Sequence, residues 1–127
     1  MAIRRATATV LSLIRIFNGA LGLVAPEKMA KQLGSAMEDD KTFVYPARMF
    51  GIRTLVLGFD LLLVRGGPRR AALLKQAVLI HGVDTLAAFY AGQRGEISPT
   101  AAKLTTTISA VNTALAITSY VVEPKEK

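Results

Sequence analysis

The chain has no cysteine and no tryptophan, and His81 is its only histidine. The absence of cysteine excludes disulfide bonds and thiol chemistry. One histidine leaves only carboxylates as further ligands, so we expect no metal site. The sequence also has no phosphate-binding glycine loop, no dinucleotide fingerprint, no serine-hydrolase elbow and no zinc-protease motif. We therefore expect no cofactor.

Acidic residues are scarce relative to basic ones, with 9 Asp and Glu against 16 Lys and Arg and a net charge of +7. In a soluble protein this excess would suggest nucleic acid as a partner. Here the basic residues cluster at the ends of apolar blocks, where anionic lipid and membrane topology explain them better. We therefore expect a lipid bilayer, and no nucleic acid, as the partner.

Long apolar blocks dominate the sequence, which is 51% hydrophobic and has a mean hydropathy of +0.37. Each block is long enough to span a hydrocarbon core of about 30 Å, and none alternates as a half-buried strand would. We predict one all-α domain over residues 1–127, an integral membrane four-helix bundle with short connections. A soluble helical bundle and a cleaved N-terminal signal are the alternatives. The predicted helices cover residues 7–25, 45–64, 71–91 and 101–122.

The longest connection follows the first block and begins PEKMAKQLG, residues 26–34. This segment predicts a short amphipathic helix lying at the membrane interface. Basic residues are concentrated at the N-terminus, in the RGGPRR connection and in the C-terminal tail. By the positive-inside rule we expect both termini to be cytoplasmic, in a bacterial-type inner or plasma membrane.

Several strongly polar residues lie inside the apolar blocks, where insertion of a central Arg or Asp costs about 2.5–3.5 kcal/mol. A Leu or Ile returns only about 0.3–0.6 kcal/mol, so these residues must face inward, toward each other or toward water. Counting from the block ends puts Arg15, Arg53, His81 and Asn112 near the midplane of the membrane. Asn18 and Asp84 lie about one turn toward the outside, and Asp60 lies toward the cytoplasm.

His81 and Asp84 are three residues apart and share a helix face, as a general acid/base pair would. We interpret His81, Asp84 and Asp60 as candidate catalytic groups. We interpret Arg15, Asn18, Arg53 and Asn112 as candidate substrate-binding groups. The two arginines could also grip an anionic group or stabilise an oxyanion. Alternatively, the two arginines and two aspartates balance as structural ion pairs.

The run YPARMFGIRTLVLGFDLLL resembles small four-helix membrane proteins of the DoxX-like group and its uncharacterised relatives. The similar features are a first helix ending in a Gly then a Pro (Gly19, Pro26), a second helix with R-x-F-G-x-R-x-x-x-x-G, and an aspartate (Asp84) on the third. The second-helix motif is Arg48, Phe50, Gly51, Arg53 and Gly58 here. The resemblance covers most of the chain and implies a four-helix membrane bundle. It implies little about activity, and His81 is not part of the pattern.

The sequence therefore predicts a small integral membrane enzyme that acts on a lipophilic small molecule in an intramembrane polar pocket. The expected acid/base chemistry is isomerisation, cyclisation or epoxide opening. The alternative is a non-catalytic membrane subunit or lipid-binding module whose buried charges form structural ion pairs. A dimeric ion-coupled transporter is a third functional hypothesis. A second copy or another membrane protein could be a partner, because small residues such as Gly51 and Gly58 favour close helix packing.

Overall fold

The computed structural model describes residues 2–32 and 41–124, and every element in this part of the chain is a helix. The all-α prediction is therefore confirmed. The four long helices occupy the four predicted blocks, and α2 occupies the predicted amphipathic segment, whose last two residues lie outside the described part. The helices are α1 (Ala2–Val24), α2 (Pro26–Gln32), α3 (Val44–Leu63), α4 (Gly67–Gln93) and α5 (Pro99–Val121).

Proline and glycine set the helix boundaries, as their backbone chemistry requires. Pro26 opens α2 directly after α1 ends, in the first turn, where its missing N–H costs nothing. The Ser98 side chain caps α5 by accepting a hydrogen bond from the backbone N–H of Ala101 at 3.1 Å, and Pro99 is the first helical residue. Gly95, with a φ of +70°, turns the chain between α4 and α5.

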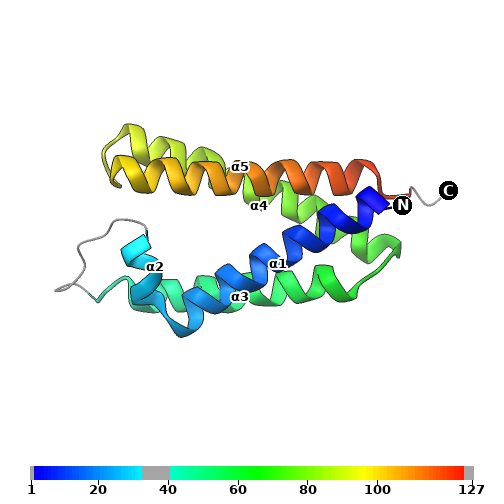
Figure 1. Ribbon diagram of the computed structural model, residues 1–127, viewed down its shortest axis with the longest axis horizontal. Helices are drawn as coiled ribbons and strands as arrows, with labels where there is room; N and C mark the ends of the chain where they lie inside the picture. The colour runs from blue at the N-terminus through cyan, green and yellow to red at the C-terminus, as the bar shows by residue number, and fades with distance from the viewer. Residues whose placement is uncertain (1, 33–40, 125–127) are drawn as a thin grey trace.

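The long helices form two pairs, α1 with α3 and α4 with α5, that diverge from one end of the molecule (Figure 1). At the end where the pairs meet lie the first turn of α1, the end of α5 and the connection from α3 to α4. We call this the closed end. The pairs are spread apart at the opposite end, where α2 and the connection from α4 to α5 lie, and we call this the open end.

Glycines allow the backbones of α1 and α3 to touch. A Cβ atom on Gly51 would lie 2.7 Å from the carbonyl oxygen of Gly19, and one on Gly19 would lie 2.8 Å from the carbonyl oxygen of Gly51. Both distances are shorter than real Cβ contacts, so no larger residue fits without moving a helix. Small residues at a helix interface allow the backbones to approach closely.

The closed end holds the apolar core and a buried ion pair. Arg70 Nε donates to Glu123 Oε2 at 3.0 Å, and Arg70 Nη1 donates to the carbonyl oxygens of Leu61 and Val64 at 3.3 and 2.7 Å. Arg70 thereby caps the end of α3, where carbonyl groups lack helical partners. The core cluster consists of Leu11, Leu61, Leu73, Leu74, Ala77 and Ala116.

The outer surface carries many large apolar side chains, and they occur on all four long helices. Two stretches of the described chain, Arg5–Val24 and Gly67–Gln93, are long and apolar enough to cross a membrane. Four such spans were predicted. Helix α3 carries three charged residues, Arg48, Arg53 and Asp60, and α5 is rich in Thr and Ser; neither is among these two stretches. Representative exposed side chains are Phe17 in α1, Phe59 in α3, Leu86 in α4 and Val121 in α5.

Candidate functional site

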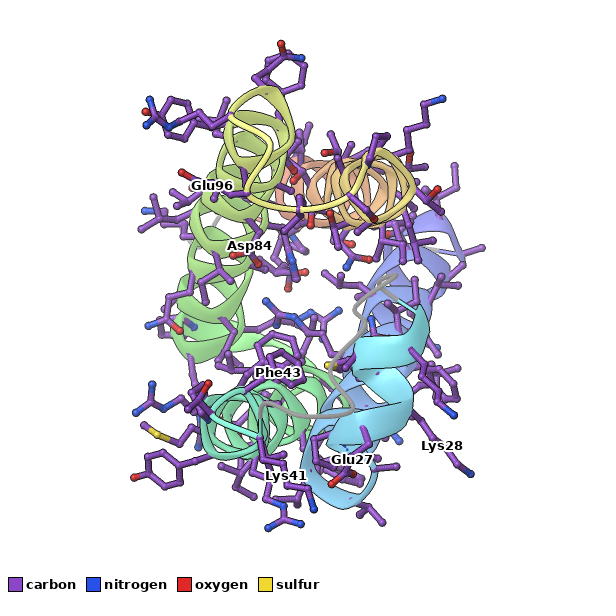
Figure 2. All side chains as sticks on the ribbon, turned by 90° about the vertical axis from the view of Figure 1, so that its left-hand side faces the viewer. Glu27, Lys28, Lys41, Phe43, Asp84 and Glu96 are labelled. Atoms are coloured by element: carbon purple, nitrogen blue, oxygen red, sulfur yellow. The ribbon has the colours of Figure 1, made fainter. Side chains whose placement is uncertain are left out.

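A cavity of about 820 Å³ occupies the space between the two helix pairs toward the open end. All five helices contribute to its wall, and most of the lining side chains are apolar. Figure 2 looks into the molecule from the open end and shows Phe43 and Asp84 directed into the space between the pairs. The volume lies within the roughly 300–1,000 Å³ range of small-molecule sites in proteins.

Two buried polar side chains meet where the cavity borders the core. Arg15 in α1 is 2% exposed and His81 in α4 is 7% exposed. Nε of Arg15 donates a hydrogen bond to Nε2 of His81 at 2.9 Å. Nε2 must offer its lone pair to accept this bond, so the ring proton lies on Nδ1 and the imidazole is neutral.

Asp84 lies on the cavity side of His81. One carboxylate oxygen, Oδ2, is 3.9 Å from Nδ1 of His81, which is too long for a hydrogen bond but close enough for electrostatic attraction. The Asp84 side chain is 49% exposed. Arg15, His81 and Asp84 therefore form a series from the buried boundary of the core to an accessible carboxylate in the cavity.

Two buried polar atoms of this region have no hydrogen-bond partner among the described residues: Nη2 of Arg15 and Oδ1 of Asn112. The Asn112 side chain reaches the cavity from α5 and is 4% exposed. A buried unpaired donor or acceptor costs about 1–3 kcal/mol, so native proteins seldom leave one without a ligand or water. Both side chains line the cavity, and these two atoms are a donor and an acceptor that the described residues leave unpaired.

Arg53 and Asn18 also line the cavity, from α3 and α1. The Arg53 side chain is exposed and the Asn18 side chain is half-buried. Within the described part of the chain neither forms a hydrogen bond or an ion pair. Arg53 therefore offers a whole guanidinium group to the cavity.

The structure brings together six of the seven predicted site residues. Asp60 is the exception, since it lies outside the cavity and its Oδ1 accepts a hydrogen bond from Nη2 of Arg69 at 3.2 Å. Asp60 and Arg53 are on similar faces of α3, but seven residues separate them by about 10 Å along the axis, which puts Asp60 at the closed end. The six that line the cavity are Arg15, Asn18, Arg53, His81, Asp84 and Asn112.

Sequence reasoning did not identify the apolar part of the wall or the closed-end ion pair. Met29 of α2 and Phe43 before α3 line the cavity, and both come from the connection after the first predicted helix, which was interpreted only as an interfacial amphipathic segment. Arg70 was considered only as one of the basic residues that determine membrane topology. No local pattern pairs it with Glu123, which is 53 residues away.

No three His, Cys, Asp or Glu side chains of the described residues gather closely enough to hold a metal ion. No family model, curated protein or solved structure matches the chain. The resemblance to the DoxX-like group therefore remains a prediction, and the function has to be argued from the cavity itself.

Proposed function

We propose that the protein is an integral membrane four-helix bundle that binds a lipophilic small molecule in its cavity. We propose further that it is an enzyme that removes protons from this ligand and returns protons to it. The membrane part of the proposal is supported by the distribution of polar and apolar side chains, which is the reverse of that in a soluble protein. Arg15, His81 and Asn112 are buried, whereas large apolar side chains are exposed on every long helix. A bilayer suits that outside, and the polar residues then lie where a membrane protein tolerates them, in the interior.

The proposed topology rests on the basic residues at the closed end. Arg65 and Arg69 are exposed there, in and next to the short connection between α3 and α4. Short basic connections stay on the cytoplasmic side. In the proposed topology both termini are cytoplasmic, and the cavity opens in the opposite half of the membrane.

The observation that carries the enzymatic part is the accessible carboxylate of Asp84 beside a buried, neutral imidazole. His81 gives its Nε2 lone pair to Arg15, so it is not the free base of the pair. Asp84 removes a proton from one position of the ligand and returns it at another, with His81 holding the carboxylate in place. The Arg15 and Arg53 guanidinium groups stabilise the negative charge that develops on the ligand between these steps. The net reaction is an isomerisation. In a cyclisation or an epoxide opening, a protonated Asp84 instead donates its proton to the ligand, and the resulting carboxylate takes back the proton that the closing ring or the attacking water releases.

Solvent isotope uptake tests this function without a known substrate. Purified protein in detergent is incubated in D₂O and H₂¹⁸O with a total lipid extract of its host, and products are compared by mass spectrometry. Wild type should place deuterium on carbon in a lipophilic product, or ¹⁸O if an epoxide opens by hydration. Asp84→Asn should abolish this uptake. Asp60→Asn, the same substitution on a carboxylate outside the cavity, should retain it.

A non-catalytic lipid-binding module is the second candidate. The Arg70–Glu123 pair favours it, because this buried ion pair lies outside the cavity, where a structural role accounts for it. Under this alternative the cavity holds its ligand unchanged. A lipid that co-purifies with wild type, combined with isotope uptake that is equal in wild type and Asp84→Asn, would support the module and reject the enzyme.

A further inference from the structure

The described residues that line the cavity carry an excess of positive charge, which the sequence alone did not predict. Arg15 and Arg53 both line it, and Asp84 is the one carboxylate among the described lining residues. Asp60, which would have balanced the second arginine, is hydrogen-bonded to Arg69 outside the cavity. His81 adds no charge, because its Nε2 accepts a hydrogen bond from Arg15. Two cations therefore face one anion in mostly apolar surroundings.

The unpaired hydrogen-bonding groups that line the cavity indicate the chemistry of the ligand that would satisfy them. Nη2 of Arg15 is buried without an acceptor, and the Arg53 guanidinium has no partner in the described chain. Carboxylate and phosphate oxygens are the acceptors that best match a guanidinium, both in charge and in planar geometry. The unpaired Oδ1 of Asn112 requires a donor, which a hydroxyl beside such a head group supplies.

The rest of the cavity suits an apolar chain. On α3 the wall extends from Pro46 to Leu57, a length of about 16 Å at the rise of an α-helix. Two aromatic side chains, Phe43 and Phe50, line the cavity in this region. A volume of about 820 Å³ lies in the small-molecule range and suits one chain better than a two-chain phospholipid.

We infer that the cavity binds a single-chain amphiphile whose anionic head, a carboxylate or a phosphate, contacts Arg15 and Arg53 at the inner end. Its apolar chain extends along α3 toward the open end. This inference rests on the proposed function, since it names the class of ligand on which Asp84 would act. The excess charge of the cavity attracts the head group, and the apolar wall buries the chain.

Equilibrium binding to the protein in phosphatidylcholine nanodiscs tests the inference with three probes of one chain length: dodecanoate, dodecyl phosphate and dodecanol. At least one anionic probe should bind about tenfold or more tightly than dodecanol, as expected when a charged hydrogen bond is gained. A preference for dodecanoate identifies a carboxylate as the head group, and a preference for dodecyl phosphate identifies a phosphate. If dodecanol binds as tightly as both, or if no probe binds, the inference is wrong.

Two matched variants locate the head group. Arg53→Gln should weaken binding of the preferred anionic probe about tenfold and leave dodecanol binding unchanged. Arg48→Gln removes the same charge from an exposed position on the same helix, outside the cavity, and should leave both unchanged. Equal weakening by the two substitutions would mean that the probe responds to surface charge, and would overturn the inference. The isotope experiment judges the proposed function separately, since tight dodecanol binding refutes only the charged head group.

Discussion

Nε of Arg15 lies 2.9 Å from Nε2 of His81, and this hydrogen bond joins two helices whose backbones scarcely approach each other. Arg15 belongs to α1 of one helix pair and His81 to α4 of the other. The bond therefore ties the pairs together where the core ends and the cavity begins. It also orients the imidazole ring so that Nδ1, and not Nε2, faces Asp84.

Replacing His81 should show how much this bond contributes to stability. His81→Leu removes the acceptor and leaves two buried nitrogens of Arg15 unpaired, which we expect to destabilise the fold by about 1–3 kcal/mol. His81→Gln keeps a carbonyl acceptor and should recover part of the loss. Thermal unfolding followed by far-UV circular dichroism in detergent measures both. A His81→Leu protein as stable as wild type would show that Arg15 finds another acceptor.

The contact between α1 and α3 gives a second prediction, because two glycines of the chain differ sharply in their surroundings. A Cβ on Gly51 would collide with the backbone of α1, whereas a Cβ on Gly82 in the middle of α4 would meet nothing within 4 Å. Gly51→Ala should therefore destabilise by about 1–3 kcal/mol, the usual effect of overpacking. Gly82→Ala should be neutral or stabilise by up to about 1 kcal/mol, because alanine favours the helix. Equal effects would contradict the close approach of α1 and α3.

The sequence predicted the helices and most of the site for a simple physical reason. Apolar blocks bounded by Pro and Gly are local signals, and a polar residue inside such a block must face the interior wherever the partner helices lie. That argument placed Arg15, His81 and Asn112 inside, and the structure buries all three. It required no knowledge of which helix packs on which.

Apart from the number of membrane spans, the differences between prediction and structure concern relationships between distant segments. Asp60 was expected in the site because it shares a face with Arg53, but its hydrogen-bond partner is Arg69, near the start of α4. The spread of the two helix pairs, which creates the cavity, has no local signal at all. The buried partner of Glu123 likewise becomes evident only when the end of α5 is placed beside the start of α4.

The closed end supplies a third prediction, a contrast between a buried and an exposed ion pair. The side chains of Arg70 and Glu123 are 7% and 5% exposed, whereas those of Arg69 and Asp60 are 69% and 35% exposed. Glu123→Ala leaves a buried guanidinium without its counter-ion and should cost about 3–5 kcal/mol. Asp60→Ala should cost no more than about 1 kcal/mol, because water screens that pair.

Double-mutant cycles separate the pairs from other effects of each substitution. The Arg70→Ala and Glu123→Ala cycle should give a coupling energy well above that of the Arg69→Ala and Asp60→Ala cycle. Chemical unfolding of all variants in the same detergent supplies the free energies. Similar couplings in both cycles would mean that the closed end admits water and is not a packed core.

The absence of cysteine makes the proposed topology directly measurable, because any cysteine introduced is the only reactive thiol in the chain. Glu96→Cys marks the connection between α4 and α5 at the open end, and Gly66→Cys marks the connection between α3 and α4 at the closed end. Both positions are exposed, and Gly66 has an extended backbone that any residue adopts.

A membrane-impermeant maleimide added to intact cells should label Glu96→Cys and leave Gly66→Cys unlabelled until the cells are lysed. The reverse pattern would place the termini outside and open the cavity toward the cytoplasm. Equal labelling of both positions only after lysis, with the protein released from membranes by alkaline carbonate, would refute the membrane bundle itself.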